Sequence, residues 1–323
     1  MITDIFESFK GLASAQSRVE LSAIALPGVR SDYLARSEEG APVFLLSDSS
    51  SPIYVPAIEL RNVRVDFHRT CSVSANGSHF EGQFATISCD AGVPELYEIF
   101  IRSVAASLQQ LSSSATTSEL QECIQSLLRL FRDLSRPSNK NIAGLWGELF
   151  VIYSSRRKDL LLAAWHLDVK ERFDFSWDVG CLEIKATTME RRSHQFAQEQ
   201  LNPPEVGSGH VVSVMLRKLN GGLGVVDLAK EIEKEILSFP ELRTKLWKSV
   251  LQCVGSDFSE RLDVRFDLDY AERNVMIVAM SEVPNVHENR DSRISAIRFQ
   301  ADLSSITAPC GVSALAKIGS MFS

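Results

Sequence analysis

The sequence lacks most of the patterns that mark zinc-binding, secreted or membrane proteins. Its six cysteines are scattered without a C-x-x-C pair, which argues against a zinc site and against a disulfide framework. No stretch approaches the roughly 18 uninterrupted apolar residues of a membrane span, and the N-terminus has no basic start followed by an apolar block. A Gly-rich phosphate loop and a His-rich metal cluster are also missing. We therefore expect a cytoplasmic globular protein.

The chain also lacks an excess of positive charge. The chain has 34 Lys and Arg against 41 Asp and Glu, which gives a formal net charge of -7. An enzyme that acts on nucleic acid normally uses a basic surface to bind phosphate. Either the basic residues are locally concentrated, as in Arg156-Arg157-Lys158 and Arg191-Arg192, or a partner supplies the grip.

With 323 residues, 45% of them hydrophobic, the chain can fill one large core or two ordinary ones. The patterns predict a mixed α/β (α+β) protein with three segments. Residues 1–92 form a β-rich N-terminal module with a hairpin turn at Asn76-Gly77. Residues 93–137 form a helical hairpin that connects it to the rest. Residues 138–323 combine helices with strands and end in a β extension.

The segment between Arg172 and Thr187 carries the most chemical information. Alternation places Phe173, Phe175 and Trp177 on one face of a strand. Asp174, Ser176 and Asp178 take the other face, with Asp178 best explained as a turn residue. In the next run, Glu183 and Lys185 share a face. The pattern therefore predicts a β-hairpin with its charged side chains on one side.

A tight turn centred on Val179-Gly180 sets the register that we expect for this hairpin. It pairs Ser176 with Glu183 and Asp174 with Lys185. Asp174 and Glu183 are then diagonal neighbours, with Cβ atoms roughly 7 Å apart. That separation is short enough for the two carboxylates to share a cation.

Two carboxylates on one ion suit Mg²⁺ or Mn²⁺, which prefer oxygen ligands and retain water. The backbone carbonyl of Ile184 is a candidate third ligand. A lysine beside the ion orients or helps to deprotonate the attacking water and offsets charge on the phosphate. The residues thus predict hydrolysis of phosphodiester bonds, with Asp174, Glu183 and Lys185 at the centre.

A helix precedes the hairpin and opens at a Ser138 or Asn139 cap. Its buried stripe includes Leu145, Trp146 and Leu149, while Gly144 and Gly147 leave room for a close approach to a sheet. Glu148 borders this stripe. It is either a surface residue or a member of the site.

These motifs resemble the PD-(D/E)XK nuclease superfamily, the fold of many restriction endonucleases. The resemblance rests on Gly144-Leu145-Trp146-Gly147-Glu148-Leu149, Phe173-Asp174-Phe175 and Glu183-Ile184-Lys185-Ala186-Thr187. They look like an uncharacterised bacterial branch that occurs in anti-phage defence or restriction-like operons beside ATPases. Phe173 replaces the proline that usually precedes the aspartate.

The resemblance implies a core of mixed sheet flanked by helices and a role for each motif residue. Asp174 and Glu183 would bind the metal, Lys185 would be the catalytic lysine, and Glu148 would be an auxiliary acid or a ligand of a second metal. His194, Gln198 and Gln200 would lie on a helix after the second strand and contact the nucleic acid.

We therefore expect a Mg²⁺- or Mn²⁺-dependent endonuclease, or a nuclease subunit, that acts on DNA in a bacterial defence system. Its expected partners are DNA and an operon-encoded protein such as an ATPase. A homodimer would bring two centres together for double-strand cleavage. The alternative is a non-catalytic scaffold or DNA-binding subunit that keeps the fold. A hydrolase of small phosphate esters is a third and weaker alternative.

Overall fold

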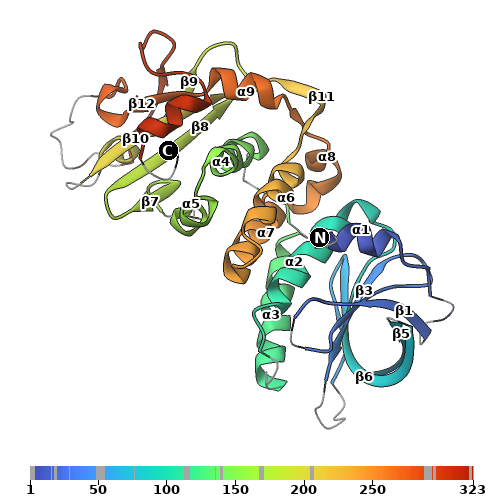
Figure 1. Cartoon of the computed structure of the whole chain (residues 1–323). Helices are drawn as coiled ribbons and strands as arrows, with labels where there is room; N and C mark the ends of the chain where they lie inside the picture. Colours follow the sequence, from blue (N-terminus) through green and yellow to red (C-terminus); the bar gives the residue numbers. More distant parts are fainter. Residues whose placement is uncertain are drawn as a thin grey trace. The chain divides into compact units, whose positions relative to one another are not determined.

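The computed structural model describes residues 4–15, 17, 20–28, 30–48, 55–75, 77–112, 117–134, 136–138, 141–166, 171–203, 207–286, 293, 296–319 and 322. Contacts divide the chain into two compact units, Met1–Ser138 with Arg243–Ser259, and Asn139–Leu242 with Glu260–Ser323. Both units combine helices with strands, which confirms the α/β class (Figure 1). Within the described part, no helix is long and apolar enough to cross a membrane. The three-segment division expected from the sequence stays a prediction.

The strands of the first unit form a six-stranded sheet that closes on itself. Its order is β1-β2-β3-β6-β5-β4, and β1 also pairs in parallel with β5. Alternate side chains fill the interior, among them Leu45, Val73 and Phe84. The bounds are β1 Glu20–Ala25, β2 Tyr33–Arg36, β3 Pro42–Ser47, β4 Ile58–Glu59, β5 Val63–Ala75 and β6 Ser78–Cys89.

The hairpin of β5 and β6 lies where the sequence predicted a turn. Ala75 pairs with Ser78, so the loop has two residues, and Gly77 has a φ of 77° that favours glycine. Asn76 lies outside the described residues. The expected alternation of β5 is interrupted, because a register shift between Asp66 and Arg69 leaves Phe67 only partly buried.

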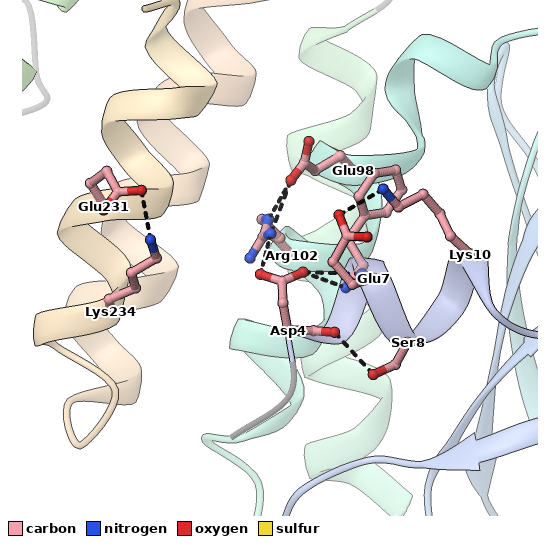
Figure 2. A network of polar contacts seen from close by, with 9 residues as sticks. Asp4, Glu7, Ser8, Lys10, Glu98, Arg102, Glu231 and Lys234 are labelled. Carbon is pink, nitrogen blue, oxygen red and sulfur yellow. Dashed lines mark hydrogen bonds and ion pairs between the residues drawn. The ribbon is translucent and has the colours of Figure 1, made fainter. Parts of the chain in front are cut away.

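Helices complete the core of the first unit. The two helices predicted after the β-rich module are present, and Phe100 of the first contacts Phe44 of the sheet and Phe131 of the second. Arg102 is buried between the carboxylates of Asp4, at 2.6 Å, and Glu98, at 2.9 Å (Figure 2). The bounds are α1 Ile5–Lys10, η1 Pro94–Leu96, α2 Tyr97–Leu108, α3 Thr117–Asp133, α7 Pro240–Val254 and η3 Gly255–Asp257.

The second unit is built on a four-stranded mixed sheet in the order β12-β10-β8-β7. The strands β8 and β10 are parallel, whereas the outer pairs are antiparallel. A two-stranded ribbon of β9 and β13 is separate from it. The bounds are β7 Phe175–Trp177, β8 Gly180–Thr187, β9 Ser193–Ala197, β10 Ser208–Met215, β11 Lys218–Leu223, β12 Met276–Ala279 and β13 Arg298–Asp302.

Helix α4 packs on β8, as Figure 1 shows. A Cβ atom on Gly147 would lie 3.0 Å from the Cβ of Ala186, so glycine permits this close approach, whereas Gly144 has no such neighbour. The predicted N-cap of helix α4, Ser138 or Asn139, was wrong. The side chain of Asn141 caps the helix by accepting from the amide of Ala143, and Ser138 instead donates to the carbonyl of Gln252. Asn139 lies outside the described residues.

The remaining helices belong to the second unit, except that the first two residues of α8 belong to the first unit. The expected amphipathic helix after β10 is present as α6, with Leu228 and Ile232 fully buried. The bounds are α4 Ile142–Ser154, α5 Lys158–Ala164, η2 Gln198–Leu201, α6 Val225–Glu235, α8 Phe258–Leu262, α9 Leu268–Asn274, η4 Met280–Glu282 and η5 Val312–Lys317.

Candidate nuclease centre

The predicted hairpin exists, but its register differs by two residues from the one expected. Phe175 pairs with Leu182 and Trp177 with Gly180, so the loop consists of Asp178 and Val179. Asp178 is thus a turn residue, as predicted. Since a shift of two residues preserves the side-chain faces, Asp174 and Glu183 still share a side. Continued by one residue, the observed register places these two residues directly opposite each other.

Asp174 lies one residue before β7 and binds the neighbouring strand through its side chain. Its Oδ2 atom accepts a hydrogen bond from the backbone N–H of Ile184 at 2.7 Å. The N–H and C=O groups of one strand residue point to the same side. The carbonyl of Ile184 therefore points to the side of β8 on which Asp174 lies, which suits its predicted role as a ligand.

Glu183 is buried in the middle of β8, with 2% of its surface exposed. Its Oε1 atom accepts from Lys185 Nζ at 2.7 Å and from Gln200 Nε2 at 2.6 Å. Its Oε2 atom is also buried, yet it has no hydrogen-bond partner among the described residues. A buried carboxylate oxygen without a donor is costly unless a cation or a proton satisfies it.

The side chain of Gln200 connects the acid and the base of this centre. Its Nε2 donates to Glu183, while its Oε1 accepts from Lys185 Nζ at 3.2 Å and from the amide of Ala197 at 3.0 Å. The ring of Phe196 lies 5.1 Å from Lys185 Nζ. Gln200 therefore fixes the positions of both side chains. The sequence had suggested only a nucleic-acid contact for it.

Burial changes the proton affinity of both carboxyl groups. Loss of solvation, together with the charge of Asp174, raises the pKa of Glu183 to about 8, although Lys185 opposes the shift. Burial also raises the pKa of Asp174, against the hydrogen bond from Ile184 and the charge of Lys185. Two neighbouring buried carboxyl groups resist ionisation when they are alone. A bound cation stabilises both of them as anions.

The residues of the centre fit a divalent ion with oxygen ligands. Asp174, Glu183 and the Ile184 carbonyl supply three oxygen donors, and the Oε2 atom of Glu183 is free to accept a cation. No group of three or more His, Cys, Asp or Glu side chains suited to a metal occurs in the described part of the chain. An ion held by so few protein ligands retains water, as Mg²⁺ usually does.

The structure connects Glu148 to the centre through aromatic residues. Its Oε2 atom accepts a hydrogen bond from the indole of Trp165 at 2.7 Å. Trp165 stacks on Phe175, the residue after Asp174, with ring centroids 6.4 Å apart. The role of Glu148 as an auxiliary acid or as a ligand of a second metal stays a prediction.

The sequence predicted that His194, Gln198 and Gln200 lie on one helix, and this was wrong for His194. His194 lies on strand β9, is 5% exposed and bonds Ser213 Oγ at 2.8 Å through Nε2. Burial lowers the pKa of His194 to about 4, so the ring is neutral near pH 7. Gln198 and Gln200 lie on the short helix η2. The alternation of His194 and Phe196 fits a strand better than a helix.

His166 is a neighbour of the centre that sequence reasoning missed. Its backbone N–H donates to the carbonyl of Asp174 at 2.8 Å, and its Nε2 atom lies 2.5 Å from Ser176 Oγ. Its charge is also one of the influences that lower the pKa of Asp174. No spacing motif includes His166. The sequence did place its partner Ser176 on the same strand face as Asp174.

The short basic runs are largely engaged in contacts within the unit. Arg157 pairs with Asp159 at 2.8 Å and Lys158 with Glu235 at 2.9 Å. Arg192 donates to the carbonyl and the hydroxyl of Ser213. These contacts reduce the positive charge that the runs offer to phosphate.

Comparison with known proteins gives one family and no individual relative. The model of the family DUF4420, whose description is "Putative PD-(D/E)XK family member", matches residues 5–304. No curated protein and no solved structure matches the chain. The family match covers both structural units and includes every residue of the candidate centre. The chain therefore belongs to the PD-(D/E)XK family DUF4420.

Proposed function

We propose that the protein hydrolyses phosphodiester bonds of DNA with a divalent ion, Mg²⁺ or Mn²⁺, bound by Asp174 and Glu183. The observation that carries this proposal is the buried Oε2 atom of Glu183, which lacks a hydrogen-bond partner among the described residues beside a second carboxylate and a lysine. Family membership supports a nuclease-like fold.

The chain's own groups have distinct tasks in this reaction. When bound, the ion polarises a phosphate oxygen and supplies an activated water. Lys185 offsets negative charge on the phosphate and orients the attacking water. Gln200 holds Lys185 and Glu183 in place through its two hydrogen bonds. The aromatic contact with Phe196 limits the motion of the Lys185 ammonium group.

Cleavage of plasmid and phage DNA with Mg²⁺ or Mn²⁺ tests this function. We expect Asp174→Ala and Lys185→Ala to lower the rate by at least about 100-fold. The matched controls are Asp178→Ala, in the exposed loop of the same hairpin, and Lys234→Ala, on the surface of α6. Equal rates in wild type and in the Asp174 and Lys185 variants would overturn the assignment.

We further propose that the nuclease works with a protein partner in a bacterial defence system, such as an ATPase from the same operon. The net charge of -7 and the internal pairing of Arg157 and Lys158 support a partner that contributes to DNA binding. Phage protection measured with and without Asp174→Ala separates this proposal from a scaffold role. Protection that persists in the variant favours the non-catalytic scaffold.

A further inference from the structure

A cavity of about 410 Å³ opens at the C-terminal end of β8. Ala186, Thr187 and Thr188 form one side of it, and Ala186 directly follows Lys185 of the centre. Its volume lies within the range of about 300 to 1,000 Å³ that is typical of ligand sites. In open α/β sheets, ligands commonly bind outside the carboxyl ends of parallel strands, and β8 and β10 are parallel.

The charge of the cavity differs from that of the protein as a whole. Its described lining residues include Lys218 and no aspartate or glutamate, although acidic residues outnumber basic ones in the chain. Lys218 is exposed on β11 and has no ion-pair partner in the described part of the chain, unlike Lys158 and Lys234. This lining favours an anionic ligand.

Carboxamides provide the other polar groups of the cavity. Gln195 and Gln300 face each other across the β9 and β13 ribbon, and Asn141 caps helix α4 nearby. Gln300 donates to Ser193 Oγ at 2.7 Å through Nε2, which leaves its carbonyl oxygen available. A carboxamide offers a donor and an acceptor side by side, and this pair matches the hydrogen-bonding edges of nucleobases.

The lining of the cavity begins at Ala186, one residue beyond Lys185 along β8. A strand rises about 3.3 Å per residue, so Ala186 and Thr187 lie within about 7 Å of the Lys185 backbone along the strand. A base inside a duplex cannot enter such a cavity without leaving the stack. Resting on the function proposed above, we propose that this cavity binds one unpaired nucleotide of the strand that is cut, with its base beside Gln195 and Gln300 and its phosphate beside Lys218.

Binding to the full chain in EDTA tests this site without cleavage. The probe is a fluorescein-labelled single-stranded DNA of 10 nucleotides, followed by anisotropy and competed with deoxynucleoside monophosphates, deoxynucleosides or inorganic phosphate. We expect Lys218→Ala and the double variant Gln195→Ala with Gln300→Ala each to weaken binding about tenfold. The side chains are exposed, so thermal unfolding should be unchanged.

Controls separate the cavity from general charge and polarity. Lys234→Ala removes an equal charge outside the cavity, and Gln121→Ala removes an exposed carboxamide from helix α3; both should bind like wild type. Deoxynucleoside monophosphates should compete better than deoxynucleosides or inorganic phosphate. Equal competition by phosphate shows an anion site only, and equal affinity of all variants shows no site; either result overturns the proposal.

The outcome is independent of whether the protein cuts DNA. If wild type does not cleave but the cavity variants lose nucleotide binding, the nucleotide site stands and the proposed nuclease function fails. If wild type cleaves and the cavity variants bind and cleave like wild type, the nuclease function stands and the nucleotide site is refuted.

Discussion

Binding of Mg²⁺ to the metal-free protein is expected to release a proton from Glu183. The pKa of this group is raised to about 8 by burial and by Asp174, so at pH 7 about nine molecules in ten carry the proton, whereas at pH 9 about one in ten does. A metal ligand must be a carboxylate. Glu183 alone should therefore release about 0.9 proton per ion at pH 7, and its ionisation should raise the apparent affinity about tenfold from pH 7 to pH 9; any proton on Asp174, whose pKa is also raised, adds to this release.

Isothermal titration calorimetry measures both quantities. At pH 7, the binding heat in two buffers with different ionisation enthalpies gives the number of protons released. The Glu183→Gln variant should bind Mg²⁺ much more weakly and without the pH dependence, while Asp178→Asn should behave like wild type. An affinity that is the same at pH 7 and pH 9, with no proton released, would refute the burial argument or the role of Glu183 as a ligand.

Three further predictions follow from packing and hydrogen bonds. Gly147→Ala should destabilise the protein by about 1 to 3 kcal/mol in chemical denaturation, because its Cβ would press on Ala186; Gly144→Ala, which meets only the Asn141 Cβ at 3.8 Å, should not destabilise it. Gln200→Ala should weaken Mg²⁺ binding at least about tenfold in calorimetry, because it removes the contacts that orient Glu183 and Lys185; unchanged affinity would contradict this role. His194 has a pKa lowered to about 4, so the unfolded chain binds a proton first as the pH falls below about 6.5, and stability should drop by about 3 kcal/mol between pH 6.5 and pH 4. Denaturant titrations of wild type and His194→Asn across that range check this, and parallel pH profiles would speak against it.

The sequence predicted the faces of the hairpin but not its register. Hydrophobic alternation has a period of two, so it cannot distinguish a register from one shifted by two residues. The choice between the two depends on which residues form the loop, and here the loop contains Asp178 and Val179. The prediction of Asp174, Glu183 and Lys185 on one side therefore survives, while their pairing was wrong.

The ribbon that carries His194 was harder to predict because its partner strand is distant. Strand β9 pairs with β13, about 100 residues later, so no local turn signal links them. The same ribbon leads into η2 and hence to Gln200, whose contacts with Glu183 and Lys185 depend on this tertiary arrangement. A spacing motif records residues near each other in sequence, and Gln200 lies 15 residues beyond Lys185.

The first unit is made of two separate stretches of the chain, and this limits the order in which the nascent chain can fold. Residues 243–259 belong to this unit together with residues 1–138, and Arg102 of α2 lies over the ring of Trp247 at 5.5 Å. On the ribosome, domains usually fold as they emerge, from the N-terminus onward. Here the buried side chains of α7, such as Leu246 and Trp247, can join the first unit only after most of the second unit has been translated. A fragment that stops before residue 243 should therefore be prone to aggregation, which makes the position of α7 a practical guide for designing shorter expression fragments.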